Sequence, residues 1–261
     1  IRFGSMPTRN RFDFGPSNPF TPDPEILVPT TRQGTYYVLV FGNQGAAAPY
    51  RVEARVLGFE VVGVTPQIVE NAGRVTLELK GSQFNQQTTF QLLTAQEVVQ
   101  AESVFFENTA LAYPTFDLTD VDPGVYGLRS IRGDGRTADQ AGAVVVVAGT
   151  GAQLNSQTLG PSQVRPFRVN QMEIAIGNSG GGDVETPLIV VHSETNTPFG
   201  PDSHPLSSTP QLFLGLAPSG PANVMRPGQS SGVSLAFQSG TASQSIQFNV
   251  DLISASDTRL V

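Results

Sequence analysis

The stretch Pro123-Gly124-Val125-Tyr126-Gly127-Leu128 decides the fold, and it recurs in variant form as Gly34-Thr35-Tyr36-Tyr37-Val38-Leu39-Val40. In both copies a turn glycine precedes a tyrosine, and apolar residues follow. The pattern is typical of a strand that enters a β-sandwich near its end, with the tyrosine ring buried and its hydroxyl bonded back to the turn. We therefore expect Tyr126, and Tyr36 or Tyr37, to anchor one strand each.

The rest of the chain favours the all-β class. Short apolar runs alternate with turn residues at intervals of roughly 8–12 residues, which is the pattern of a sandwich. Val75, Leu77 and Leu79 alternate with polar residues and are expected to face a core. The best helical candidate, residues 95–102, fits strands equally well. We expect almost no helix.

The chain divides into three expected units, residues 1–57, 58–150 and 151–261. Residues 149–153 read as a small, flexible linker, and the Pro/Ser/Thr-rich stretch 194–210 as a long loop. In the first unit we expect strands at 1–3, 11–14, 25–28, 35–41 and 50–57, with Val52 and Val56 facing a core. This unit looks like half a module, so we expect the chain to be an excerpt of a longer polypeptide or a processed fragment.

Composition excludes several classes of function. The net charge of −7 argues against nucleic acid or an anionic membrane surface as a partner. The chain has no cysteine, which rules out disulfides, thiol nucleophiles and cysteine-ligated metals. No apolar run approaches the roughly 20 residues of a membrane-spanning helix, so we expect no membrane insertion. Few charges and many Ser, Thr and Gly residues favour an exported bacterial protein, extracellular or on the cell surface.

Three motifs carry a family resemblance. They are Phe59-Glu60-Val61-Val62-Gly63-Val64-Thr65-Pro66, then Gly73-Arg74-Val75-Thr76-Leu77-Glu78-Leu79-Lys80-Gly81-Ser82-Gln83-Phe84, and Pro123-Gly124-Val125-Tyr126. Together they make residues 58–150 resemble an IPT/TIG immunoglobulin-like domain. The resemblance implies an immunoglobulin-like β-sandwich and brings no set of catalytic residues.

The flanking units also resemble bacterial surface modules. Residues 25–56, with Gly34-Thr35-Tyr36-Tyr37-Val38, look like the end of a bacterial pre-peptidase C-terminal domain. Residues 151–261, with Gly177-Asn178-Ser179-Gly180 and Val224-Met225-Arg226-Pro227-Gly228-Gln229, resemble the Ig-like modules of very large bacterial surface proteins. These resemblances imply tandem immunoglobulin-like sandwich modules in an extracellular, multi-domain protein.

Candidate catalytic residues are few. His192-Ser193-Glu194 holds the three residue types of a hydrolytic triad. Adjacent residues on an extended chain point to opposite faces, however, so these three are not expected to form a relay. A metal site of His192, His204 and Asp202 is a second hypothesis for the loop. We expect no catalytic residue, no cofactor-binding residue and no cofactor.

Three other motifs have both a binding and a structural interpretation. Asp117, Asp120 and Asp122 share one turn and are candidate calcium ligands, since Ca²⁺ takes six to eight oxygens; the alternative is that they cap turns. Arg132-Gly133-Asp134 spells an adhesion triplet but sits where a tight hairpin turn is expected. Residues 180–182 are three glycines without the lysine of a phosphate loop, and are expected to form a flexible turn.

These observations predict a non-catalytic structural or adhesive spacer of a large surface protein. Its partners would be other modules of the same polypeptide or neighbouring copies. One alternative is a module that binds a glycan or protein ligand through the loop at 194–210 or at 15–24, which a large exposed aromatic loop surface would favour. Another is an accessory β-domain of a secreted hydrolase, which an adjoining catalytic domain would favour.

Overall fold

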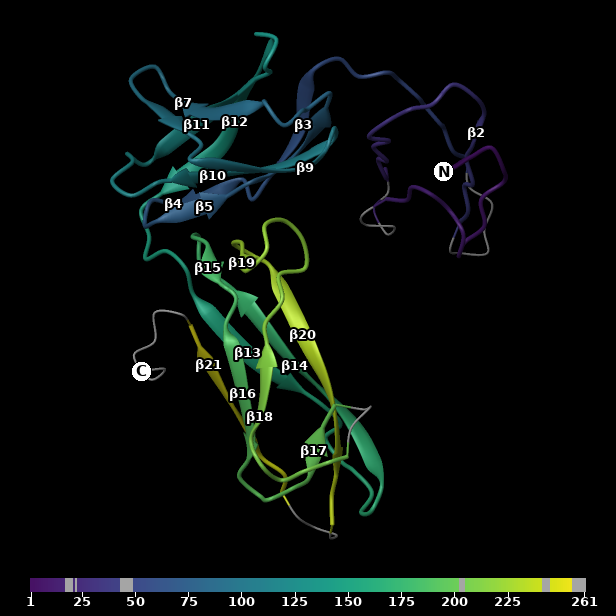
Figure 1. The fold of residues 1–261 in the computed structure, drawn as a ribbon, viewed down its shortest axis with the longest axis vertical. Helices are drawn as coiled ribbons and strands as arrows, with labels where there is room; N and C mark the ends of the chain where they lie inside the picture. The colour runs from purple at the N-terminus through teal and green to yellow at the C-terminus, as the bar shows by residue number, and fades with distance from the viewer. Residues whose placement is uncertain (17–20, 22, 43–48, 202–204, 241–244, 255–261) are drawn as a thin grey trace.

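The computed structural model describes residues 1–16, 21, 23–42, 49–201, 205–240 and 245–254 (Figure 1). Within these residues the protein consists of strands, turns and irregular segments, and it contains no helix. The expected all-β class is therefore confirmed. Two groups of strands each surround a hydrophobic core of their own, and we call them the first body and the second body.

The first body consists of two five-stranded sheets. One sheet has the order β3-β6-β10-β5, with β9 also paired to β10; the other has the order β4-β12-β11-β7-β8. All pairs are antiparallel except β12 with β4. The strands are β3 (Glu60–Thr65), β4 (Ile68–Glu70), β5 (Arg74–Thr76), β6 (Glu78–Ser82), β7 (Thr89–Leu93), β8 (Val98–Gln100), β9 (Ser103–Asn108), β10 (Leu111–Asp117), β11 (Gly124–Ile131) and β12 (Thr137–Val147).

Alternation in the sequence explains the core of the first body. Val75, Leu77 and Leu79 are all buried, as expected, and they pack with apolar residues of the facing sheet. The run at residues 144–147 lies in β12, between β4 and β11, where a strand has neighbours on both edges. Burial of these apolar faces supplies the main favourable free energy of folding.

Tyr126 occupies the position that the opening motif predicts. Its ring is buried, and its hydroxyl donates to the carbonyl of Asp122 at 2.9 Å and to Glu97 Oε2 at 2.6 Å. Burial and then the hydrogen bond to Glu97 raise the pKa of Tyr126 to about 12. The expected bond back to the turn is confirmed for this strand.

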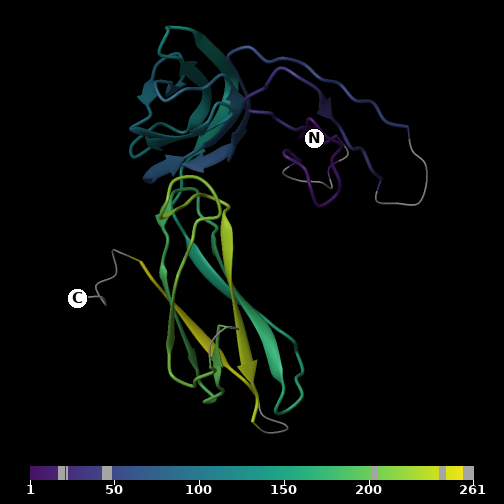
Figure 2. The same ribbon diagram turned by 45° about the vertical axis from the view of Figure 1, so that its right-hand side comes forward.

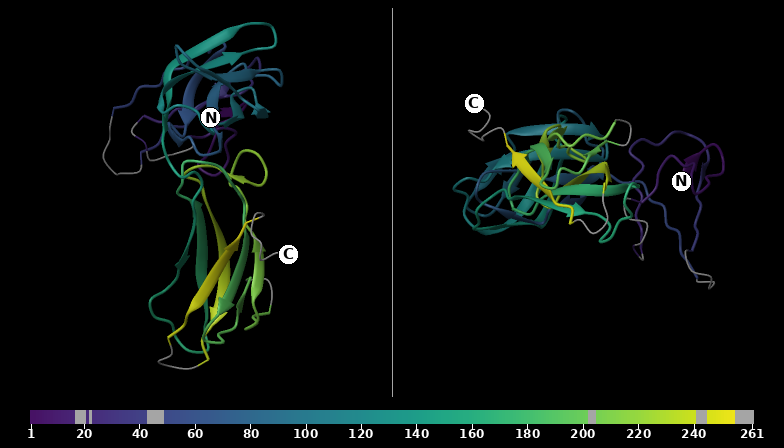
Figure 3. Two further views of the ribbon diagram at one scale, coloured as in Figure 1. Left: turned by 90° about the vertical axis from the view of Figure 1, so that its left-hand side faces the viewer. Right: turned by 90° about the horizontal axis from the view of Figure 1, so that it is seen from below.

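The second body is longer and narrower (Figures 2 and 3). One sheet has the order β13-β14-β20-β17, and another has the order β18-β16-β21. Between them lie Ile174, Ile189, Val191, Leu235 and other apolar residues of the second core. The strands are β13 (Leu154–Leu159), β14 (Val169–Asn178), β15 (Val184–Glu185), β16 (Leu188–Ser193), β17 (Phe199–Gly200), β18 (Gln211–Leu214), β19 (Val224–Met225), β20 (Ser230–Gln238) and β21 (Phe248–Ile253).

The N-terminal segment departs from expectation. Its described residues contain only β1 (Arg2–Phe3) and β2 (Tyr36–Tyr37), which pair with each other. Residues 11–14, 25–28 and 50–57 form no strand, and the strand expected over 35–41 is reduced to two residues. The prediction that Val52 and Val56 face a core is wrong, since the two side chains are 55% and 98% exposed. Alternation alone does not hold a strand that lacks partners.

The first copy of the tyrosine motif is thus only partly realised. Tyr36 is half-buried, and its hydroxyl accepts a hydrogen bond from the backbone N–H of Arg32 at 2.8 Å. Tyr37 is exposed. Both Tyr36 and Tyr126 therefore bond to the backbone four residues earlier, although only Tyr126 lies in a large core.

Candidate functional site

The candidate functional site is the contact between the two bodies, which stack end to end (Figures 1 and 2). We call this contact the joint. From the first body it takes Glu70, Arg74, Thr76, Glu78 and Tyr113. From the second body and the connecting chain it takes Gly151, residues 179–183, Ser219, Gly220 and Arg226. Its side chains are charged, hydroxylic or absent, so the joint is chemically distinct from either core.

An ion pair crosses the joint. Arg226 Nη2 donates to Glu78 Oε2 at 2.9 Å, and the two side chains are only 5% and 19% exposed. The same nitrogen donates to Ser219 Oγ at 3.0 Å. The guanidinium lies 4.8 Å from the ring centroid of Tyr113, which fits a cation–π contact. Arg226 therefore joins an acid and an aromatic ring of the first body to a loop of the second.

Tyr113 lies in a part of the joint that is shielded from water. The residue is buried, and Gly220 lies so close that a Cβ there would sit 3.3 Å from the ring. Burial, followed by the nearby charges of Glu78 and Glu107, raises the pKa of Tyr113 to about 12, although Arg226 acts in the opposite direction. The phenol is thus held in its neutral form.

A second polar contact involves Asp183. Its backbone N–H donates to the carbonyl of Arg74 at 2.7 Å, and its Oδ2 accepts from Thr76 Oγ1 at 2.5 Å. Thr76 Oγ1 also lies 2.8 Å from Thr115 Oγ1. Burial raises the pKa of Asp183, while the bond from Thr76 works against that rise. Among the described residues, Asp183 Oδ1 has no hydrogen-bond partner.

Glycines allow the two backbones to approach. Gly151 N–H donates to Glu70 Oε2 at 2.7 Å, and Glu70 N–H donates to the carbonyl of Gly181 at 3.0 Å. A Cβ on Gly180 would lie 2.1 Å from the Gly151 carbonyl oxygen, and one on Gly181 would lie 2.3 Å from Glu70 Cγ. Side chains cannot fit at either position without a shift of their surroundings.

These contacts correct two expectations. Residues 149–153 were expected to form a flexible linker and 180–182 a flexible turn. Instead, the two segments are hydrogen-bonded to each other and to Glu70. Their glycines are needed because the two backbones lie close together, and not because the segments must be flexible. The signal in the sequence was the cluster of glycines directly after β14. The sequence contains no signal for the partners of Arg226 and Asp183, because those partners lie far away in the chain.

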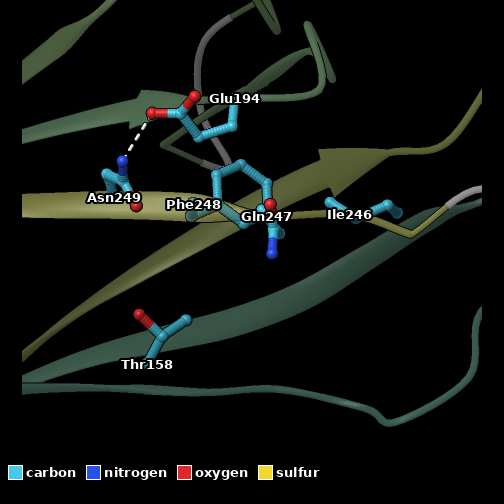
Figure 4. A pocket seen from close by; sticks show the side chains of 6 residues that line it. All are labelled: Thr158, Glu194, Ile246, Gln247, Phe248 and Asn249. Atoms are coloured by element: carbon cyan, nitrogen blue, oxygen red, sulfur yellow. Dashed lines mark hydrogen bonds between the residues drawn. The ribbon is translucent and has the colours of Figure 1, made fainter.

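An open hollow lies on the side of the second body (Figure 4). It is an open hollow of about 620 Å³, lined by Thr158, Glu194, Ile246, Gln247, Phe248 and Asn249. Glu194 Oε1 is already bonded to Asn249 Nδ2 at 2.5 Å. The Phe248 ring packs on Phe199 and Phe237, so it belongs to the core. Phe248 is the one aromatic residue among those that line the hollow, and its ring also belongs to the core.

The structure does not assemble His192, Ser193 and Glu194 into a triad, as expected. His192 Nε2 lies 3.2 Å from Glu194 Oε1, whereas Ser193 Oγ accepts from the backbone N–H of Thr197 at 2.9 Å. Ser193 points away from the other two, as expected for adjacent residues of a strand. His204 and Asp202, the other proposed ligands of a metal site in this loop, lie outside the described residues.

The three candidate calcium ligands have separate structural roles in their turn. Asp117 Oδ1 accepts from the backbone N–H of Thr119 at 2.9 Å, and this turn bonding to Thr119 lowers the pKa of Asp117. Asp120 has a positive φ of 63°, and the carbonyl of Asp122 receives the Tyr126 hydroxyl. In the described part of the chain, no three His, Cys, Asp or Glu side chains gather as a metal site would require. These aspartates shape the turn into β11.

The Arg-Gly-Asp triplet forms the hairpin between β11 and β12. Arg132 N–H donates to the Arg136 carbonyl, and Gly135 has a φ of +84°. Asp134 Oδ2 accepts from Arg136 Nη2 at 2.9 Å and lies 3.4 Å from Arg132 Nη1. The expected tight turn is confirmed, and the aspartate is engaged within the turn.

Across the described residues there is no helix with the length and hydropathy needed to cross a membrane. A scan of the chain against models of known protein families matches none of them, and a search of curated proteins likewise finds no match.

Proposed function

We propose that this chain is a non-catalytic structural spacer of an exported bacterial surface protein. In this proposal the first body is an IPT/TIG-like immunoglobulin module and the second body is a further immunoglobulin-like module. The residues before the first body are the end of a pre-peptidase C-terminal-like module. The chain then acts mechanically, by holding what lies at one end away from what lies at the other.

The joint is the observation that carries the proposal. Two bodies on a loose linker change their relative orientation freely, whereas a stiff spacer has to keep its two ends in a fixed relative orientation. Here the connection from β12 to β13 is fixed by hydrogen bonds to Glu70, and the Arg226–Glu78 pair spans the contact. Such partly buried, directional contacts define one relative orientation better than apolar packing does.

The bodies themselves support the modular interpretation. Each has its own core between two sheets, and Tyr126 bonds back to its turn as in the tyrosine corner of immunoglobulin-like sandwiches. The polar network of Arg226, Glu78, Asp183, Thr76 and Glu70 lies at the joint between the two bodies. A structural role accounts for this distribution better than a catalytic one.

A distance measurement across the joint tests the proposal. Because the chain has no cysteine, Val125→Cys in the first body and Leu159→Cys in the second, both exposed, place one spin label on each. A stiff spacer gives a single narrow distance distribution, which Arg226→Ala broadens. A distribution in the parent that is already as broad as in the variant would contradict the proposal. So would turnover of ester, peptide or glycan substrates that disappears on His192→Ala.

A further inference from the structure

One outer face of the second body carries five apolar residues that do not contribute to its core, beside Asp251 and His192. In the β18-β16-β21 sheet, Ile189, Val191 and Phe213 point to the core, while Leu188, Val190, Leu212, Leu214 and Ile253 lie on the opposite face. Leu212 and Leu214 are 62% and 61% exposed. We call this set of five residues the leucine face.

The leucine face ends at an open strand edge. In the described residues β18 pairs with β16 on one side and with no strand on the other. Gly215 N–H donates to the carbonyl of Pro187, so the alternation of an antiparallel ladder turns Gln211 and Phe213 toward β16. The backbone N–H and C=O groups of Leu212 and Leu214 therefore point outward at the edge.

This edge lacks the usual protection against pairing. Edge strands normally carry charges or are covered. Here residues 205–225, which include all of β18, contain no Asp, Glu, Lys, Arg or His. Two other edges carry charges, since β8 is flanked by Glu97 and Glu102 and β21 carries Asp251. The edge strand β13 is also uncharged, but four of its six residues, Asn155, Ser156, Gln157 and Thr158, are polar.

We propose that β18 pairs with β18 of a second copy of this chain, antiparallel and about a twofold axis at Phe213. In this register Leu212 of one copy lies opposite Leu214 of the other. Both residues direct their backbone groups outward, so each pair exchanges two hydrogen bonds. The leucine faces of the two copies then lie on the same side of one continuous six-stranded sheet.

The absence of charge at this edge makes it the place where a second copy can dock. The chain carries a net charge of −7, so two copies repel each other over most contacts. The uncharged stretch 205–225 is where they meet without that repulsion. Edge pairing also leaves Asp251 on the far strand β21, whereas packing the leucine faces on each other would bury its carboxylate.

The proposal goes beyond the spacer function and is tested separately. Sedimentation velocity of the full chain over a concentration series is expected to show a reversible dimer. Leu214→Asp is expected to weaken the dimer at least about tenfold, because it places a carboxylate at the edge. Leu159→Asp, at an exposed position on β13, is the matched control and leaves the dimer unchanged. Thermal melting of each variant verifies that it is folded.

Cysteine cross-linking tests the register. In the proposed pairing, Leu212→Cys in one copy faces Leu214→Cys in another at a Cα separation of about 5.5 Å, which a disulfide spans. Each variant alone places its own cysteines diagonally, beyond about 7 Å. A mixture should therefore cross-link under mild oxidation, and either variant alone should not. Three outcomes would each overturn the proposal. The chain could stay monomeric at about 0.1 mM. The dimer could survive Leu214→Asp, or either cysteine variant alone could cross-link as well as the mixture.

Discussion

Arg226 and Glu78 lie 148 positions apart in the chain, yet their side chains form a hydrogen-bonded ion pair at 2.9 Å across the contact between the two bodies. Both are largely removed from water, so each partner offsets the desolvation of the other. Removing Arg226 is destabilising, because Glu78 then stays largely buried with only Lys80, whose Nζ lies 3.6 Å from Glu78 Oε1, to compensate its charge. The pair therefore couples the stability of the two bodies.

Arg226→Ala is expected to lower the free energy of unfolding by about 3 kcal/mol, at the low end for a broken buried pair because Glu78 retains some contact with water. Calorimetry should show the two bodies melting further apart in temperature than in the parent. Arg129→Ala is the control, since its pair with Asp139 is exposed and should contribute at most about 1 kcal/mol. Equal losses for the two variants would show that the joint couples nothing.

Tyr126 offers a test of the first body alone. Tyr126→Ala removes a buried ring and should cost about 3–5 kcal/mol. Tyr126→Phe keeps the ring but leaves the Asp122 carbonyl and Glu97 without their donor, which should cost about 1–3 kcal/mol. Urea unfolding gives both values. Tyr37→Phe, at an exposed residue, should change stability by less than about 0.5 kcal/mol. A loss as large as that of Tyr126→Phe would argue against the buried bonds of Tyr126.

Gly180 tests the close approach at the joint. Gly180→Ala places a Cβ against backbone atoms of residues 151–153, which cannot rotate away as a side chain would. We expect a loss of about 1–3 kcal/mol, typical of overpacking. Gly58→Ala is the control, because its Cβ would meet nothing within 4 Å and its φ is not positive. A Gly180→Ala variant as stable as Gly58→Ala would mean that the two segments are not held together in solution.

Part of the core of the first body was predictable from sequence, whereas the joint was not. Alternation at Val75, Leu77 and Leu79 and the turn before Tyr126 are local signals, and each is borne out. The partners of Arg226 and Asp183 are set by how two bodies meet, which leaves no periodic trace in the chain. In the N-terminal segment the opposite holds: alternation around Val52 is present, but the partner strands that would bury it are absent from the described residues.

Hydrogen exchange should separate that segment from the rest. Backbone amides of residues 38–41 and 50–56 belong to no strand, and several of their apolar side chains are exposed. They should exchange in the fastest class, whereas amides of β6 should be among the most protected. Protection of 38–41 equal to that of β6, in a sample verified as monomeric, would mean that the segment forms a complete domain.

Asp183 sets the expected dependence of stability on pH. Burial raises its pKa in the folded state above the ordinary 3.8, so the folded protein binds a proton more tightly than the unfolded chain does. As pH rises from 3.8 through the folded pKa, ionisation of this group therefore lowers the free energy of unfolding.

Asp183→Asn keeps an oxygen to accept the bond from Thr76 Oγ1 and removes the ionisation. At pH 7 the variant should be more stable than the parent, and the difference should narrow as pH falls toward 3.8. Comparing the two proteins by urea unfolding at each pH cancels the opposite contributions of Asp117 and Asp139, whose pKa values are lowered. A variant that is less stable than the parent at pH 7 would show that the charged carboxylate, through Thr76 and Arg226, holds the joint together.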